Sequence, residues 1–157
     1  MNKKVAITGH TRGLGQELAQ MFRLLGWEVI GFSKSQGIDI ENDQAYIIEK
    51  IRDCDLFVNN AYANGKQLDL LNASVGLVKN IIIIGSVAAD RPDPSMPEYS
   101  ENKKILQARA REFYDSEQSN ILLLRLTGKS YADYYLIKRT INFWLEHKTF
   151  CEVTYKV

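Results

Sequence analysis

Long apolar runs are missing from this chain of 157 residues, and so is any marked excess of positive or negative charge. The longest purely aliphatic stretch, from Ile81 to Ile84, is far too short to span a bilayer, so we expect no membrane partner. The net charge of +1 gives no reason to expect binding to nucleic acid. The chain is predicted to enter a strand at its start, which leaves no signal peptide, and the cytoplasm is the expected compartment.

Cysteine and proline are also scarce. Cys54 and Cys151 are the only cysteines, and they lack the spacing of a metal site or a redox pair. We interpret both as packing residues and expect no bound metal; a disulfide is not favoured, although the sequence leaves it open. The three prolines lie close together at Pro92, Pro94 and Pro97, and no repeat or long linker divides the chain. The sequence therefore predicts one domain over residues 1–157.

Apolar runs alternate with amphipathic runs along most of the chain. The runs at residues 81–84 and 121–124 are apolar on both faces, as in a parallel sheet covered by helices on both sides. We predict an α/β fold, a doubly wound parallel sheet of the Rossmann type with about seven strands. The predicted strands are Val5–Thr8, Glu28–Phe32, a short strand ending near Asp39, Leu56–Asn59, Asn80–Ile84, Ile121–Leu126 and Glu152–Lys156. The predicted helices are Leu14–Leu25, Asn42–Ile51, a short helix near Leu68–Leu77, Tyr99–Tyr114 and Asp133–His147.

A glycine-rich octet, Thr8-Gly9-His10-Thr11-Arg12-Gly13-Leu14-Gly15, follows the first predicted strand and opens the first predicted helix. Glycines let the backbone turn sharply and admit a phosphate without a Cβ in the way. The free N–H groups and the positive dipole end of a helix N-terminus favour an anion there. In this strand–turn–helix context the octet predicts a dinucleotide site, whereas a glycine triplet alone would indicate only a turn.

Three further segments carry polar groups at the ends of predicted strands or on a helix. Asn59-Asn60-Ala61 ends one strand, and amide side chains there can hydrogen-bond the neighbouring backbone. Ser86 follows the next strand, and Tyr99 and Lys103 share one face of a predicted helix. A phenol exchanges protons poorly at neutral pH, and a nearby ammonium favours its phenolate. A Tyr and a Lys at this spacing often occur by chance, so the pair alone indicates no function. It becomes informative because it follows the glycine octet, Asn59-Asn60-Ala61 and Ser86 in that order.

The spacing T-G-x-x-x-G-x-G, followed by Asn-Asn-Ala, Ser86 and Tyr99-x-x-x-Lys103, resembles the short-chain dehydrogenase/reductase family over nearly the whole chain. The resemblance implies hydride transfer between a nicotinamide and a small-molecule carbonyl or alcohol substrate. It implies Tyr99 as the general acid–base, Lys103 as its tuning partner on the nicotinamide ribose, and Ser86 as the group that orients the substrate oxygen. The residues implied at the cofactor are Thr8, Gly9, Thr11, Arg12, Gly13, Leu14, Gly15, Ser33, Lys34, Asp39, Ile40, Asn59, Asn60, Ala61, Tyr99, Lys103 and Thr127.

The tip of the second predicted strand bears on the choice between NADP and NAD. An acidic residue at this tip binds the ribose 2′-hydroxyl of NAD and repels a 2′-phosphate. Here the tip carries Ser33 and Lys34, and Arg12 lies in the glycine turn. This set favours NADP(H) over NAD; the alternative is that Lys34 and Arg12 are ordinary solvated charges.

The chain departs from the family pattern in several places. It is much shorter than most members, and the segment between Asn60 and Ser86 is too small for the long helix that carries a catalytic asparagine. Asn72 is the only candidate in that segment, with an ordinary helix-end residue as the alternative. Tyr62 stands where the family has a glycine after Asn-Asn-Ala, and no substrate lid is expected after Thr127.

Two functions remain compatible with these features. The first is an NADP(H)-dependent carbonyl reductase with Tyr99 as the proton donor. The second is an NADP(H)-binding regulatory module with weak activity or none, which the shortened substrate region motivates. We also expect a homo-dimer or homo-tetramer that associates through the helix from Tyr99 to Tyr114, the usual contact surface in the family.

Overall fold

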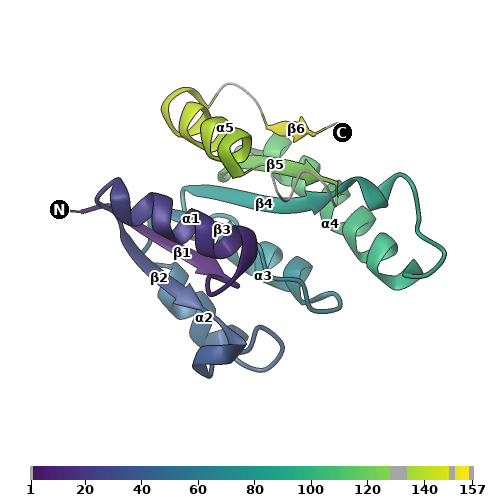
Figure 1. Cartoon of the computed structure of the whole chain (residues 1–157), viewed down its shortest axis with the longest axis horizontal. Helices are drawn as coiled ribbons and strands as arrows, with labels where there is room; N and C mark the ends of the chain where they lie inside the picture. The colour runs from purple at the N-terminus through teal and green to yellow at the C-terminus, as the bar shows by residue number, and fades with distance from the viewer. Residues whose placement is uncertain (1, 128–133, 149–150, 156–157) are drawn as a thin grey trace.

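The computed structural model of the chain describes residues 2–127, 134–148 and 151–155. Within these ranges six parallel strands form one sheet, in the order β2-β1-β3-β4-β5-β6 (Figure 1). The strands are β1 (Lys4–Thr8), β2 (Glu28–Phe32), β3 (Leu56–Asn59), β4 (Asn80–Ser86), β5 (Asn120–Leu126) and β6 (Glu152–Thr154). The α-helices are α1 (Gly13–Leu24), α2 (Gln44–Ile51), α3 (Lys66–Ser74), α4 (Pro97–Ser116) and α5 (Tyr134–His147), with short 3-10 helices η1 (Lys34–Gln36) and η2 (Val87–Ala89).

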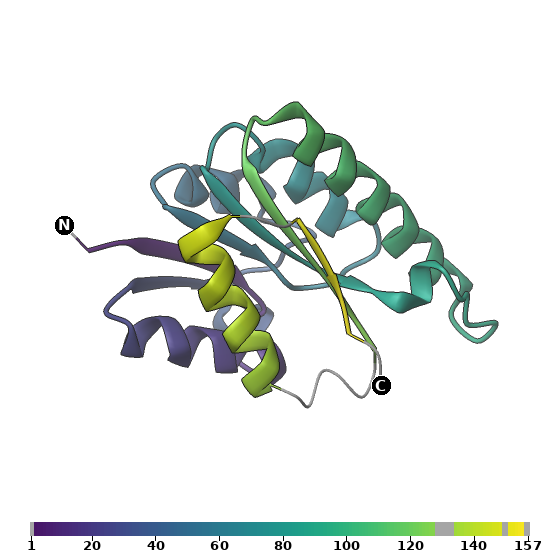
Figure 2. The same ribbon diagram turned by 90° about the horizontal axis from the view of Figure 1, so that it is seen from above.

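Two helical layers cover the two faces of the sheet. Successive side chains of a strand point to opposite faces, so each strand supplies both layers. In β1, Val5 and Ile7 pack with α1 and α5, whereas Ala6 packs on the opposite side with α2, α3 and α4. Figure 2 shows α1 and α5 together on one side of the sheet and α3 and α4 on the other. The prediction of a doubly wound parallel sheet is therefore confirmed.

The predicted strand ending near Asp39 is wrong, and the described sheet has six strands rather than about seven. After β2 the chain forms the turn η1 and then runs without strand pairing to Asp39. A parallel strand needs a crossover of a dozen or more residues to return to the starting edge of the sheet. The six residues between Phe32 and Asp39 are too few for that return.

The other predicted elements are present, with ends shifted by a few residues. The largest extension is in α4, which begins two residues earlier and ends two residues later than predicted. β4 continues two residues further than predicted and ends at Ser86. β6 is described only as far as Thr154, and the predicted end residues Lys156 and Asp133 lie outside the described residues. Cys54 is buried and Cys151 half-buried, and both are free thiols. In the described ranges no helix is long and apolar enough to cross a membrane.

The strand order places a crevice at the carboxyl end of β1. This strand pairs with β2 on one side and with β3 on the other, so the connections that follow β1 and β3 diverge at that point. Open α/β sheets bind ligands at such a switch point. The glycine octet and Asn59-Asn60-Ala61 both lie there, one after β1 and the other at the end of β3.

Candidate active site

The glycine turn brings the end of β1 into close contact with the start of α1. Gly9 and Gly13 have positive φ angles of 71° and 56°, a region that residues with a Cβ rarely adopt. A Cβ built on Gly15 would lie 2.0 Å from the carbonyl oxygen of Gly9. Because α1 begins at Gly13, its first N–H groups have no partner within the helix and lie at the positive end of the helix dipole. The turn therefore forms a narrow cradle that suits a phosphate group.

The close approach at Gly15 gives a first prediction. Gly15→Ala should lower the free energy of unfolding by about 2 kcal/mol, because the new methyl group must displace the backbone of Gly9. Denaturant unfolding followed by circular dichroism measures this change. Gly13→Asn is the matched control, because no atom lies within 4 Å of a Cβ at Gly13 and asparagine tolerates a positive φ angle. Equal stability losses in the two variants would contradict the proposed crowding at Gly15.

Hydrogen bonds from Asn60 and Ala61 fix this turn. The Thr8 hydroxyl accepts hydrogen bonds from the backbone N–H groups of Asn60 and Ala61, each at 3.0 Å. The Asn60 side chain donates from Nδ2 to the carbonyl oxygens of Thr8 at 3.0 Å and Gly9 at 3.4 Å. The sequence-predicted residues Thr8, Gly9, Asn60 and Ala61 are thus brought together across neighbouring strands. They hold the cradle rigidly before any ligand arrives.

A cleft of about 700 Å³ extends from the glycine turn toward the tip of β2; we call it the glycine-turn cleft. Eight residues that the sequence predicted for cofactor binding line it: Gly9, Thr11, Arg12, Ser33, Lys34, Asp39, Ile40 and Ala61. The side chain of Leu14 instead packs in the core, so only its backbone N–H, in the first turn of α1, is available to a ligand. The volume of the cleft and its mixed polar and apolar lining suit a dinucleotide rather than a small apolar ligand.

At the tip of β2, three hydroxyl groups form a cluster beside two cations. Ser33 Oγ lies 2.8 Å from both Thr11 Oγ1 and Ser35 Oγ, and the Thr11 and Ser35 hydroxyls are 3.1 Å apart. Arg12 and Lys34 lie beside these hydroxyls in the lining of the cleft. Ser35 is an addition to the predicted set, and its place next to Ser33 and Lys34 in the sequence was the available signal.

A carboxylate also reaches this region. Asp39 pairs with Lys34 at 3.7 Å, but its oxygens also accept hydrogen bonds from the backbone N–H of Glu41 and the side chain of Asn42. The Asp39 carboxylate is thus held by its own turn. Lys34, by contrast, is largely exposed, so its ammonium can turn toward a ligand.

Lys103 is buried at the centre of the site, with 2% of its surface exposed. Its Nζ donates hydrogen bonds to the side-chain oxygen of Gln67 at 2.8 Å and to the carbonyl oxygen of Ile84 at 2.9 Å. Burial disfavours the charged ammonium and lowers the pKa of Lys103 to about 7. Near neutral pH this side chain can therefore hold or release a proton.

Gln67 holds this lysine in place and was missed from the sequence. Its Nε2 donates to the carbonyl oxygens of Asn59 at 2.9 Å and Ile84 at 3.0 Å, which joins the ends of β3 and β4. The side chain of Asn59 in turn donates to the backbone oxygen of Gln67 at 2.9 Å. The available signal was a polar residue on the buried face of a helix, since Gln67, Leu70, Leu71 and Ser74 are the buried residues of α3.

Asn72, the predicted catalytic asparagine, is not brought to this group. It lies on α3 but is exposed, because the buried face of this helix contains positions 67, 70, 71 and 74. The Gln67 side chain occupies the contact with Lys103 instead.

Tyr99 is paired with a second tyrosine. The rings of Tyr99 and Tyr62 pack edge to face with centroids 4.8 Å apart, and Lys103 Nζ lies 5.6 Å from each ring centroid. The Tyr62 hydroxyl accepts a hydrogen bond from Asn102, while its ring also lines the glycine-turn cleft. Tyr62, which replaces the family's glycine, therefore connects the cleft to Tyr99.

The same face of α4 also fixes the end of β4. Gln107, one turn beyond Lys103, accepts a hydrogen bond from the backbone N–H of Ser86 at 2.9 Å. The Ser86 hydroxyl accepts a bond from the N–H of Ala88 and so begins η2. Ser86 and Lys103 thus both lie at the carboxyl end of β4, because Lys103 bonds Ile84 of the same strand.

Thr127 lies apart from the glycine-turn cleft. It lines a second cavity of about 390 Å³ at the ends of β4, β5 and β6, which we call the strand-end pocket. The pocket also includes Val87, the residue after Ser86. Residues 128–133, where the family has a lid, lie outside the described residues. In the strand order β4 lies between β3, on the side of the cleft, and β5, on the side of this pocket, so Ser86 at its end lies between the two cavities. Lys103 bonds Ile84 of the same strand, and Tyr99 packs on Tyr62 of the cleft lining.

Comparison with known proteins gives a clear result for the fold. No protein-family model and no curated protein matches the chain. Among solved structures, an oxidoreductase from Brucella ovis described as a short-chain dehydrogenase/reductase is similar with a TM-score of 0.76 and 19% identity, over 99% of this chain and 100% of that one. A structure described as a small-chain dehydrogenase has a TM-score of 0.82 at 13% identity, over 99% and 97% of the two chains.

A third similar structure is a 3-ketoacyl-(acyl-carrier-protein) reductase from Brucella melitensis, complexed with NADH. Its TM-score is 0.77 at 15% identity, over 97% of this chain and 96% of that one. At these identities the similarity concerns the fold alone. The chain has the fold of the short-chain dehydrogenase/reductase structures.

Proposed function

We propose that the protein is an NADP(H)-dependent oxidoreductase that reduces a small carbonyl compound or oxidises the corresponding alcohol. The observation that carries this proposal is the placement of Tyr99 against a buried lysine at the end of β4, two strands along the sheet from a glycine cradle. A purely nucleotide-binding domain has no need of a buried amine held by two acceptors beside a phenol. The similar structures named above include oxidoreductases, and one of them is complexed with NADH.

The residues of the cleft fit a dinucleotide. The cradle at Gly15 has no space for a Cβ, and the N-terminus of α1 would hold the pyrophosphate through its free N–H groups. Asp39 and Ile40, which line the cleft, would lie at its adenine end. Lys103 is buried behind the lining, and it would act toward the nicotinamide end through Tyr62 and Tyr99, whose ring centroids lie 5.6 Å from its Nζ. A nicotinamide cofactor bound in this cleft supplies or accepts the hydride.

The remaining steps belong to the side chains of this protein. In the reducing direction Tyr99 donates its phenolic proton to the carbonyl oxygen, which becomes the hydroxyl of the alcohol. Ser86 Oγ holds that oxygen by a hydrogen bond. Lys103 stabilises the phenolate that remains, and Gln67 acts as a positioning residue because it holds Lys103 Nζ at 2.8 Å.

We propose NADP(H) rather than NAD(H) because a 2′-phosphate suits the tip of β2. Three hydroxyls, Thr11, Ser33 and Ser35, lie within hydrogen-bond distance of one another beside Arg12 and Lys34. Hydroxyl donors and cations together are a strong phosphate site. The Asp39 carboxylate pairs with Lys34 at 3.7 Å but is held in its own turn by Glu41 and Asn42, so the exposed Lys34 can turn from it toward a 2′-phosphate.

Removal of the two cations tests this choice. Arg12→Ala and Lys34→Ala should each raise the dissociation constant of NADPH about 10- to 100-fold, since a hydrogen bond to a charged group contributes roughly 1.5–3 kcal/mol. The affinity for NADH should stay within a factor of about two, because no phosphate contact is lost. Fluorescence titration with each cofactor provides both values.

Lys79→Ala is the matched control, because Lys79 is exposed at the opposite, amino end of β4. Equal binding of NADPH and NADH by the unaltered protein would refute the preference for NADP(H). Failure to bind either cofactor would refute the dinucleotide site itself.

A further inference from the structure

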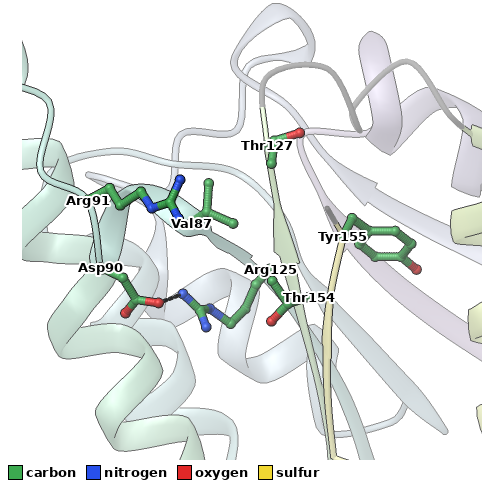
Figure 3. A pocket seen from close by; sticks show the side chains of 7 residues that line it. All are labelled: Val87, Asp90, Arg91, Arg125, Thr127, Thr154 and Tyr155. Atoms are coloured by element: carbon green, nitrogen blue, oxygen red, sulfur yellow. Dashed lines mark hydrogen bonds and ion pairs between the residues drawn. The ribbon is translucent and has the colours of Figure 1, made fainter. Parts of the chain in front are cut away.

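The strand-end pocket contains a concentration of arginines that the hydride-transfer chemistry does not use. Arg125 projects from β5, and Arg91 follows η2; both line the pocket with Thr127 and Thr154 (Figure 3). In that view the guanidinium groups of Arg91 and Arg125 lie on the same side of the pocket, whereas Tyr155 points away from them. Val87 also lines the pocket and directly follows Ser86 in the chain, so the pocket begins next to Ser86.

Arg125 is buried, and its hydrogen bonds are incomplete. Only 8% of its surface is exposed, and its Nε–H is buried with no hydrogen-bond partner in the described part of the chain. It forms an ion pair with Asp90 and a longer one with Glu152 at 3.6 Å. That Nε–H is closed to solvent, so a ligand in the pocket would contact Arg125 through its terminal nitrogens, which are also the atoms paired with the two carboxylates.

Neither carboxylate neutralises the pocket fully. Glu152 is held mainly by Arg111, which donates two hydrogen bonds to it at 2.8 and 3.0 Å and lowers its pKa. The Asp90 side chain is 60% exposed, so water screens its attraction to Arg125. Arg91 is exposed and forms no ion pair within the described residues. Among the charged residues that line the pocket, two arginines, Arg91 and Arg125, outnumber one carboxylate, Asp90, which leaves a net charge of +1.

We propose that the strand-end pocket binds an anionic group of the substrate between Arg91 and Arg125, so that the substrate is a small carbonyl compound bearing a carboxylate or a phosphate. This inference rests on the proposed function for the identity of the reacting carbonyl, but the anion site itself does not. The planar guanidinium groups match both anions. Val87 lines the pocket and follows Ser86 in the chain. When the anionic group is bound in the pocket, the carbonyl of a small substrate would therefore lie near Ser86. Asp90 competes with the ligand for Arg125, and its exposure allows it to move aside.

Direct binding tests the site without any turnover. Isothermal titration of the protein with succinate, and separately with inorganic phosphate, measures the affinity for each anion with and without NADPH. Arg91→Gln should weaken binding of the preferred anion at least tenfold. Asp90→Asn should strengthen it severalfold, because the amide keeps the shape of the carboxylate and removes its competing charge. Arg109→Gln is the control, since Arg109 pairs with Glu112 on the exposed side of α4.

Opposite effects of Arg91→Gln and Asp90→Asn would support the site, because a merely structural role would make both changes neutral or both harmful. Equal affinities in all variants, or no binding of either anion, would overturn the inference. The larger affinity, for succinate or for phosphate, identifies which anion the pocket prefers.

Turnover provides a second arm. We expect kcat/KM for 4-oxopentanoate to exceed that for 2-hexanone at least a hundredfold if the pocket takes a carboxylate. The corresponding pair for a phosphate is dihydroxyacetone phosphate against dihydroxyacetone. Arg91→Gln should reduce the favoured ratio by about tenfold or more. Neutral ketones turned over as well as their anionic partners would refute the anion site and leave the proposed function intact. Binding of succinate or phosphate by a protein that does not bind NADPH would instead refute the proposed function and leave the anion site intact.

Discussion

Tyr99→Phe should reduce kcat for carbonyl reduction about a thousandfold while the affinity for NADPH stays within a factor of about two. A positioned general acid contributes on the order of 10²–10⁴ to the rate, and phenylalanine keeps the ring but has no proton to donate. The ring contacts with Tyr62 and Lys103 are retained, so the fold should not change. Steady-state kinetics and fluorescence titration on the same preparation separate the loss of chemistry from any loss of binding.

Tyr62→Phe is the sharpest control, because the structure places two phenols around one lysine. Lys103 Nζ lies 5.6 Å from the ring centroid of Tyr62 and from that of Tyr99. The Tyr62 hydroxyl, however, accepts a hydrogen bond from Asn102 on the exposed side of α4. We therefore expect Tyr62→Phe to keep most of the activity, and Tyr114→Phe, near the far end of α4, to keep all of it.

Two results would change the interpretation. A large loss in Tyr62→Phe and a small loss in Tyr99→Phe would exchange the roles of the two tyrosines. NADPH binding without turnover of any carbonyl compound, including the anionic ones above, would favour a cofactor-binding module over an enzyme. The second result would leave the glycine cradle explained, since the cradle depends on backbone geometry alone.

The features that the sequence predicted well depend on local geometry. The glycine spacing predicts a turn because positive φ angles and the absent Cβ of Gly15 are properties of those residues themselves. The face shared by Tyr99 and Lys103 follows from the helical repeat, and both side chains do lie beside Tyr62. The doubly wound sheet follows from strands that are apolar on both faces.

The features that the sequence did not reveal depend on contacts between distant segments. Gln67 meets Lys103 across 36 positions, and only the packing of α3 against α4 brings them together. No residue near Gln67 marks it as a partner of a lysine. Asn72 is predicted on a different basis, as the candidate for a catalytic asparagine, and the helical repeat places it on the exposed face. The predicted strand near Asp39 failed for a different reason, because chain length ruled out the crossover that it required.

The burial of Lys103 should make the stability of the protein depend strongly on pH. Its pKa is about 7 in the folded protein and 10.5 in the unfolded chain. Between these values the unfolded chain binds a proton that the folded protein does not, so the free energy of unfolding rises as pH increases. From pH 7 to pH 9 we expect this group to contribute a rise of about 2 kcal/mol, since a full proton difference is worth about 1.4 kcal/mol per pH unit.

Lys103→Met should abolish this rise, because methionine fills a similar volume and has no proton to lose. Denaturant unfolding at several pH values gives the difference in free energy of unfolding between the two proteins. Titrating groups common to both proteins cancel in this difference. Cys54 is one of them, since burial raises its pKa to about 11. Lys104→Met, on the exposed neighbour in α4, should keep the full rise. Gln67→Met should keep it as well, since Lys103 stays buried without its amide partner. Parallel pH profiles for Lys103→Met and the unaltered protein would mean that Lys103 is charged in the folded state well above neutral pH. Tyr99 would then have a permanent cation beside it rather than one that titrates near pH 7.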